Sequence, residues 1–308
     1  MKAIMYHYVR TYEPGLPFFR YLEVDNFRKQ LDYFEAKYGY VTYEEWCNFV
    51  ENGVAPKDPG KIILTFDDAM RCHYDFVFPE LLKRHLWGIF YVPTSPYVEH
   101  LVLDVHRIHL LCGAHSGIEL IDVANSFIEE DMIPGEKINE FRDRTYTRQK
   151  NATGVSEFKR LMNYFIDYKH RNLVINQLVN HFGLLLQADQ FYVPKNNLMK
   201  MKEQGMVIGS HSYSHPVMSR LTAAEQKSEI EKSLVVLGDL VEETHKTYCH
   251  PYGGFHSFNR ETVYVLKQLK VSYAFNVESR EIIQADYKRS KYHLPRFDCN
   301  LFPYGHAS

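Results

Sequence analysis

The sequence of 308 residues has no long apolar run, almost no net charge and few cysteines. No apolar run approaches the roughly 18 residues that a membrane-spanning helix needs, which excludes an integral membrane protein. A formal net charge of -2 argues against a partner held mainly by charge, such as bulk nucleic acid. Hydrophobic residues make up 45% and charged residues 24%, as in globular proteins, so a disordered chain and a coiled coil are excluded.

The cysteines are too few and too scattered for a disulfide framework. They form no Cys-x-x-Cys pair, which also argues against a cysteine-type zinc site, and a reducing cytoplasm is the expected location. The amino terminus, MKAIMYHYVR, lacks the apolar stretch of a secretory signal because its apolar run ends at Met5. We expect a first strand over residues 2–8 instead. The cysteines are Cys47, Cys72, Cys112, Cys249 and Cys299.

Strand-like and helix-like segments alternate in both halves of the chain. Strands are predicted at 61–66, 87–92, 206–209, 247–249, 271–276 and 294–297, with amphipathic helices between them. This alternation predicts a parallel sheet or an α/β barrel. Residues from about 97 to 195 show only helical patterns and no repeat. We interpret them as a helical insertion within a single barrel domain spanning 1–308, with a separate second domain as the alternative.

Three polar clusters each follow a predicted strand, where α/β proteins build their sites. The first is Asp67-Asp68. Neighbouring side chains on a strand point in opposite directions, so two adjacent carboxylates need different roles unless a turn redirects one of them. A helix cap followed by a solvated aspartate is the alternative interpretation of this pair.

The second cluster, SHSYSHP at 210–216, contains His211 and His215. Histidines at positions i and i+4 share one face of a helical turn and can chelate a divalent metal ion. Two of 16 histidines could also meet this spacing by chance. With Asp68, however, they would form a His-His-carboxylate triad that suits a water-activating ion, and Asp67 would remain as a general base.

The third cluster, CHPYGG at 249–254, is a Pro/Gly turn after a predicted strand. Glycine lets the backbone approach a ligand closely and can leave an amide N–H for an oxyanion. An ordinary turn is the alternative.

In this order, LTFDD at 64–68, SHSYSHP at 210–216 and HPYGG at 250–254 resemble the first three motifs of NodB-homology polysaccharide deacetylases, carbohydrate esterase family 4. MYHYV at 5–9, the segment at 27–46 and the stretch 198–237 look similar too, so the resemblance covers about two thirds of the chain. It implies a distorted, incomplete (β/α)7 barrel. It also implies that Asp67 is the catalytic base and that Asp68, His211 and His215 hold a divalent metal ion, usually zinc.

The chain departs from the family pattern in two places. Many members begin motif three with an arginine that holds the base, whereas Cys249 stands in that position here, which places the chain in the branch without this arginine. Arg296, in LPRF, is our hypothesis for the missing guanidinium. The family's late Leu-x-His motif, which delivers the acid histidine, is not evident in its usual form. His7 and His250 are therefore the candidates for the general acid, followed by His293, with a structural histidine as the alternative for each.

The expected reaction is metal-assisted hydrolysis of an N-acyl group on a sugar, N-acetyl first and N-formyl as the alternative. Tyr252, through its backbone N–H, and Pro251 beside it are the expected oxyanion or substrate contacts, together with Arg296. A cytoplasmic enzyme would act on a nucleotide- or lipid-linked intermediate of cell-surface polysaccharide synthesis. A non-catalytic carbohydrate-binding barrel and a hydrolase of cyclic imides are the competing functions. The sequence leaves the oligomeric state open.

Overall fold

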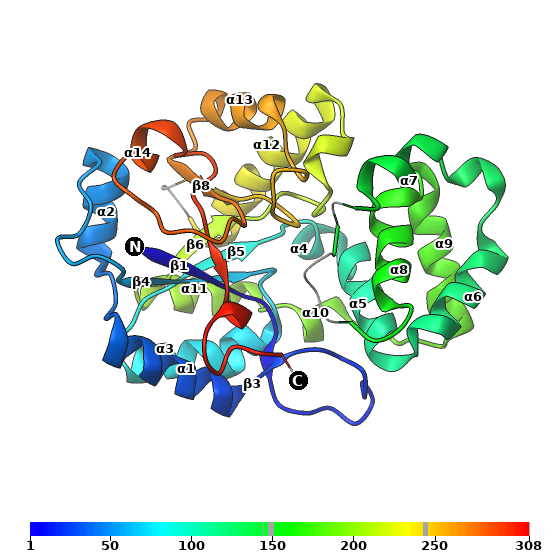
Figure 1. The fold of residues 1–308 in the computed structure, drawn as a ribbon, viewed down its shortest axis with the longest axis horizontal. Coiled ribbons are helices and arrows are strands. Elements are labelled where there is room, and N and C mark those ends of the chain that lie inside the picture. The colour runs from blue at the N-terminus through cyan, green and yellow to red at the C-terminus, as the bar shows by residue number, and fades with distance from the viewer. Residues whose placement is uncertain (144, 147–150, 243–245, 308) are drawn as a thin grey trace. The chain divides into compact units, whose positions relative to one another are not determined.

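The computed structural model describes residues 1–143, 145–146, 151–242 and 246–307. Their contacts divide the chain into two compact units (Figure 1). The first unit contains Met1–Thr11, Tyr21–His100 and Ala188–Ser308, and the second contains Tyr12–Arg20 and Leu101–Gln187. The predicted insertion at about 97–195 therefore coincides closely with most of the second unit.

The first unit is built on a seven-stranded parallel sheet with the strand order β8-β7-β6-β5-β4-β1-β9, as the α/β pattern predicts. All six neighbouring pairs are parallel. The carboxyl ends of the strands therefore lie along one edge. The strands are β1 (Lys2–Tyr6), β4 (Ile62–Asp67), β5 (Ile89–Val92), β6 (Val207–Ser210), β7 (Thr247–Cys249), β8 (Tyr273–Phe275) and β9 (Phe297–Asp298). A separate parallel pair joins β2 (Val9–Arg10) and β3 (Leu22–Glu23).

The segment from Leu294 to Asp298 brings the two edges of this sheet together. Leu294 bridges to Phe275 of β8, while β9 pairs with β1. This short segment thus contains the outer strand β9 and also contacts the opposite outer strand β8, which gives the distorted, incomplete barrel that the family resemblance implies. It also carries Arg296 between them.

Helices of the first unit connect and cover the strands (Figure 1). The Thr-x-x-Glu pattern of a capping box occurs at Thr42–Glu45 and at Thr222–Glu225 and predicts a helix start at each place. The structure confirms both predictions, at the starts of α2 and α12. The sequence also suggests Asp25 as the N-cap of the first long helix, but this is wrong, because the helix begins at Val24 and its N-cap is Glu23, which makes no side-chain cap bond. The helices are α1 (Val24–Lys37), α2 (Tyr43–Asn52), α3 (Phe78–Lys83), α4 (Pro96–Glu99), α10 (Ala188–Phe191), α11 (Lys195–Glu203), α12 (Ala223–Val241), α13 (Arg260–Gln268) and α14 (Asp286–Arg289).

Aromatic rings fill the interior against these strands. Phe66 stacks on Tyr6 at 5.3 Å and on Phe90 at 4.6 Å between ring centroids, which links three neighbouring strands. On the other side of the sheet, the buried ring of Trp46 stacks on Phe275. Such pairs stabilise a fold beyond the burial of their area by about 0.5–1.5 kcal/mol each. The many aromatic residues thus serve the core in large part.

The second unit is helical, as predicted for this region. The first residues of α6 and α8 lie so close together that a Cβ on Gly117 would be only 2.3 Å from the backbone nitrogen of Val155. The helices are α5 (Asp104–Ala114), α6 (Gly117–Phe127), α7 (Gly135–Phe141), α8 (Val155–Arg160) and α9 (Tyr168–His181).

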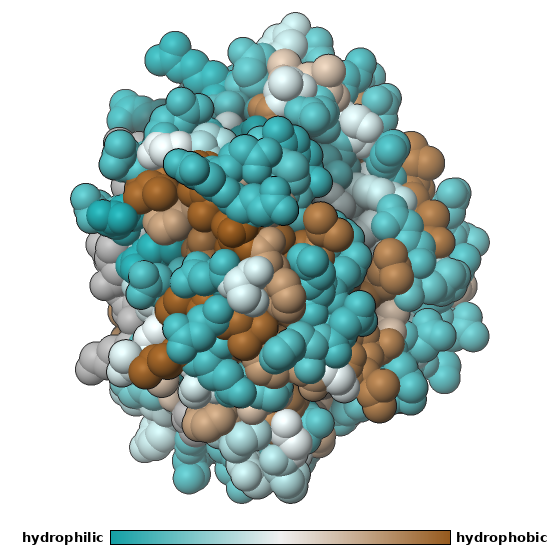
Figure 2. Space-filling model, turned by 90° about the vertical axis from the view of Figure 1, so that its right-hand side faces the viewer, coloured by the Kyte–Doolittle hydropathy of each residue, from teal (hydrophilic) through white to brown (hydrophobic). Residues whose placement is uncertain are grey.

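Apolar side chains also reach the surface, as on most folded proteins. In the face shown in Figure 2 they form patches that hydrophilic residues interrupt. Among the described residues, no helix combines the length and the apolar character required to cross a bilayer.

Candidate metal centre

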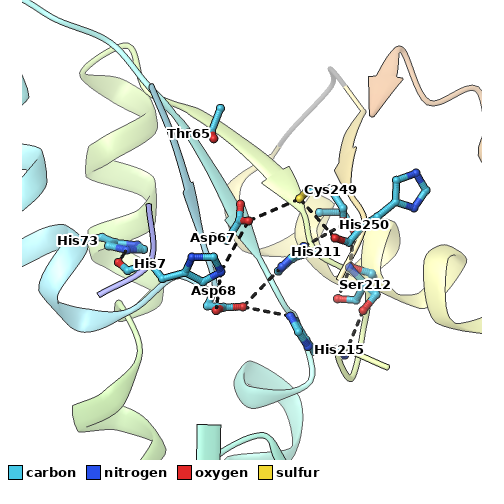
Figure 3. A network of polar contacts seen from close by, with 12 residues as sticks. His7, Thr65, Asp67, Asp68, His73, His211, Ser212, His215, Cys249 and His250 are labelled. Atoms are coloured by element: carbon cyan, nitrogen blue, oxygen red, sulfur yellow. Dashed lines mark hydrogen bonds and ion pairs between the residues drawn. The ribbon is translucent and has the colours of Figure 1, made fainter. Parts of the chain in front are cut away.

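The side chains of Asp67 and Asp68, at the end of β4, lie close to each other (Figure 3). Asp67 is the last residue of the strand, and Asp68 follows in a left-handed conformation with φ 79°. This rare backbone state turns the second side chain back to the side of the first. The turn that could redirect one carboxylate is therefore present. Both residues are only 2% exposed.

The side chains of Asp68, His211 and His215 converge. One ligand atom from each lies within 4.8 Å of the other two. The Nε2 atoms of His211 and His215 lie 3.6 and 3.3 Å from Asp68 Oδ1. Ligands about 2.1 Å from a tetrahedral ion stand about 3.4 Å apart, so this triad fits a divalent cation.

The ring of His211 is oriented by a contact behind it. Its Nδ1 lies 2.9 Å from the Cys249 carbonyl oxygen and donates to it, which leaves the lone pair of Nε2 facing Asp68. Burial lowers the pKa of His211, although Asp67 and Asp68 oppose this shift. The ring is thus held in the neutral form that binds metal.

Left-handed backbone is concentrated around these ligands. Of eleven such non-glycine residues in the described chain, four lie in the three motifs and a fifth directly follows the first motif. Strained conformations of this kind persist where the surrounding structure imposes them, often at functional sites. The histidine pair was predicted on a helical turn, but residues 211–217 form a loop, so the expected helical geometry is wrong. The five residues are Asp68, Ala69, Ser212, His215 and Tyr252.

Asp67 is held by Arg296, the residue that the sequence offered as the missing guanidinium. Both oxygens of Asp67 accept bonds of 2.8 Å from the two terminal nitrogens of Arg296. Burial alone would raise the pKa of Asp67, but Arg296, with smaller contributions from His211 and His7, lowers it to about 2. This carboxylate therefore stays ionised in the interior.

The guanidinium of Arg296 is itself enclosed, with no exposed surface. It donates to Thr65 Oγ1 at 3.1 Å and to the Cys249 sulfur at 2.9 Å, and it lies between the rings of Tyr91 and Phe275. Thr65 was not singled out from the sequence, although its position two residues before Asp67 places both side chains on the same side of β4.

His7 lies beside both carboxylates. Its Nε2 is 4.0 Å from Asp67 Oδ2 and 3.9 Å from Asp68 Oδ2, and its side chain is 38% exposed. His73, a residue that the sequence did not single out, holds the backbone at this point, because its Nε2 lies 2.6 Å from the His7 carbonyl oxygen. Among the candidate acids, His7 is the one that combines contact with the carboxylates and access to solvent.

The rings of His250 and His293 belong to a different environment. His250 points away from the carboxylates, with its Nε2 2.9 Å from the Tyr292 carbonyl oxygen and its ring stacked on Phe258 (Figure 3). Burial lowers the pKa of His250 to about 3. His293 packs edge-on near Phe255 and also lies against Phe258. These contacts match the structural alternative for both histidines.

The turn after β7 places backbone next to the ligands. The ring of Tyr252 lies 5.0 Å from that of His215, and its φ is 65°. Pro251, before it, is buried. Gly253 follows with φ 64°, and a Cβ there would lie 2.3 Å from Val277 Cγ2. Glycine is required here by both conformation and space.

Comparisons with known proteins agree with this geometry. A family model described as "Polysaccharide deacetylase" matches residues 167–274, which contain His211, His215 and the turn after β7. No curated protein sequence matches the chain.

Solved structures share the fold. The deacetylase PplD of Streptococcus pyogenes superposes with a TM-score of 0.56 at 16% identity, covering 97% of this chain and 91% of that chain. A de-N-acetylase from Aggregatibacter actinomycetemcomitans gives 0.54 at 12% identity, with 96% and 93% covered. The BpsB deacetylase domain of Bordetella bronchiseptica gives 0.52 at 13% identity, with 96% of both chains covered.

The aspartate pair lies outside the matched segment but folds against its histidines. Residues 167–274 thus resemble the polysaccharide deacetylase family model, the solved structures share the fold of the chain, and Asp68, His211 and His215 form a buried triad that is consistent with a divalent metal ion.

Proposed function

We propose that this protein is a metal-dependent hydrolase that removes an N-acyl group, N-acetyl in the first place, from a sugar. The observation that carries the proposal is the pairing of two buried carboxylates with different partners. Asp68 lies among imidazole nitrogens, whereas Asp67 is held by Arg296. One carboxylate is thus available as a ligand and the other as a base.

Asp68, His211 and His215 are the residues that would hold the cation, for which we propose Zn²⁺. When bound there, it would polarise the acyl carbonyl and acidify the attacking water. Asp67 accepts the proton of that water. Its low pKa keeps it ionised but makes it a weak base, so an acidified water is the nucleophile that suits it. Arg296 keeps the carboxylate in place while the proton moves.

Two further groups complete the proposed reaction. His7, next to the carboxylates and accessible to solvent, donates a proton to the departing amine. The backbone N–H of Tyr252 meets the oxyanion. The guanidinium of Arg296 is already paired with Asp67, which supports a positioning role for Arg296 over the substrate contact that the sequence also allowed.

For the substrate, we propose a nucleotide- or lipid-linked acylated sugar of cell-surface polysaccharide synthesis, handled in the cytoplasm. The five cysteines form no disulfide, which is the usual state in a reducing compartment.

The proposal is tested by incubating purified protein with a panel of N-acetyl and N-formyl nucleotide sugars and reading acyl release by mass spectrometry. We expect N-acetyl release from at least one sugar. Asp67→Asn should lower the rate by about 10²–10⁴-fold while keeping the metal, and His7→Ala should lower it by about 10²-fold. Release from N-formyl sugars alone would replace the acetyl assignment. Unchanged turnover in Asp67→Asn would remove that residue from its role.

A further inference from the structure

Helix α12 presents a carboxylate to the loop that carries both histidine ligands. Glu229 Oε2 accepts the backbone N–H groups of Tyr213 and Ser214 at 3.1 and 2.9 Å. Its Oε1 accepts the hydroxyl of Ser214 at 2.7 Å. Two successive amides aimed at one anion form a nest, a backbone arrangement that binds negative charge. The contacted residues lie between His211 and His215 in the chain.

One helical turn further along α12, Ser233 contacts the same loop. Its hydroxyl donates to the Ser212 carbonyl oxygen at 2.9 Å and lies 2.7 Å from the hydroxyl of Ser210. Ser233 has no exposed surface. Positions i and i+4 share one face of a helix, so Glu229 and Ser233 act together from one rigid element.

The loop needs such support because its backbone is strained. Ser212 and His215 have φ of 64° and 58°, which side-chain-bearing residues rarely adopt. Inside the loop, Ser212 Oγ accepts the backbone N–H of His215 at 3.0 Å. Without the carboxylate, the amides of residues 213 and 214 would lose their acceptor, and other loop conformations would become accessible.

We propose that Glu229, together with Ser233, is a positioning residue that holds the loop from His211 to His215 in its metal-ligating conformation. The proposal rests on the proposed function, because it assumes that the triad binds a divalent ion. It differs from a general structural role in what it predicts. Loss of Glu229 raises the free-energy cost of presenting the two imidazoles, so it weakens metal binding even when the metal-free protein is folded.

The test compares the wild type with Glu229→Ala, Glu229→Gln and Ser233→Ala. The matched control is Glu231→Gln, an exposed residue on the same helix. Zinc affinity is measured by competition with a chromophoric chelator, and ligand geometry by the visible absorption of Co²⁺-substituted protein. Circular dichroism and thermal unfolding of the metal-free proteins report on the fold.

We expect Glu229→Ala to weaken zinc binding by about 10–100-fold and to alter the Co²⁺ spectrum. Glu229→Gln should be intermediate, because an amide oxygen still accepts from the backbone while the charge is lost. Glu231→Gln should match the wild type. If Glu229→Ala does not fold, Glu229→Gln and Ser233→Ala decide the question.

Zinc affinities within about twofold of the wild type in the folded Glu229 variants would overturn the positioning role and leave the proposed function intact. If instead the wild type binds zinc no better than His211→Ala, the proposed function fails, and the positioning role fails with it.

Discussion

The loops after β6 and β7 are neighbours at the same edge of the sheet, yet they use their histidines in opposite ways. The loop after β6 points His211 and His215 at Asp68 and is fixed from behind by side chains of α12. The loop after β7 points His250 away, against Phe258. The loop after β7 instead places its backbone next to the site, and its glycines allow this close approach.

The difference shows that a histidine after a barrel strand is not by itself a sign of catalysis. The direction of the ring depends on the loop conformation and on which side offers a hydrogen-bond acceptor. For His211 the acceptor is a carbonyl inside the barrel, and for His250 it is the carbonyl of Tyr292. The following predictions test this contrast, from the largest effect to the smallest.

The variants His211→Ala and His250→Gln should show the largest difference in metal content and activity between the two loops. His211→Ala removes a ligand, so metal content should fall from about one ion per chain towards zero. Activity should fall by at least about 10³-fold, because a bound cation would lower the activation free energy by several kcal/mol. His250→Gln should keep the metal and most of the activity. Metal analysis and kcat/KM of both variants check this, and loss of metal in His250→Gln would contradict the contrast.

Gly253→Ala tests the backbone role of the loop after β7. The added Cβ would lie 2.3 Å from Val277 Cγ2, so we expect a loss of about 2–3 kcal/mol in the free energy of unfolding. Gly39→Ala is the control, because its φ of 66° is similar but a Cβ there meets nothing within 4 Å. It should cost only about 1 kcal/mol. Urea unfolding measures both, and equal losses would show that crowding at Val277 is unimportant.

The buried ring of His250 should make the fold sensitive to acid. Its pKa in the folded protein is about 3, below the value of about 6.5 in an unfolded chain. Between about pH 6.5 and 3 the unfolded state therefore binds more protons than the folded state. The free energy of unfolding thus falls as the pH drops through this range. His250→Gln should reduce that slope by about 1 kcal/mol per pH unit. Urea unfolding at pH 7, 6 and 5 measures the slope; parallel curves for both proteins would contradict the prediction.

The fold could be predicted largely from local patterns. Apolar runs such as 61–66 and 247–249 predicted strands that the structure places within one or two residues. The capping boxes at Thr42 and Thr222 predicted two helix starts, because their bonds are made within one turn. The pairing of 294–298 with both β8 and β1 could not be predicted, since it depends on contacts across the whole chain.

The residues of the candidate site could be predicted where a sequence motif contains them. The directions in which their side chains point could not, because these depend on the folded backbone. The spacing of His211 and His215 predicted that their side chains lie close together. In the structure they do, but the loop places them with left-handed backbone and not with a helical turn. Nothing in the local sequence of His250 says which way its ring points. Glu229 stands in a long polar helix pattern, and only its distance to the Tyr213 and Ser214 amides distinguishes it from its neighbours.

The ion pair between Asp67 and Arg296 joins positions 229 residues apart, and His7 directly follows the first strand. The proposed base, Asp67, therefore depends on an arginine that lies far in the chain both from it and from the proposed acid, His7. During synthesis, the metal ligands and the base leave the ribosome long before the arginine that neutralises the base. A buried carboxylate without its cation is strongly destabilising. The charged base is thus stabilised only when the segment 294–298 is docked against β1 and β8.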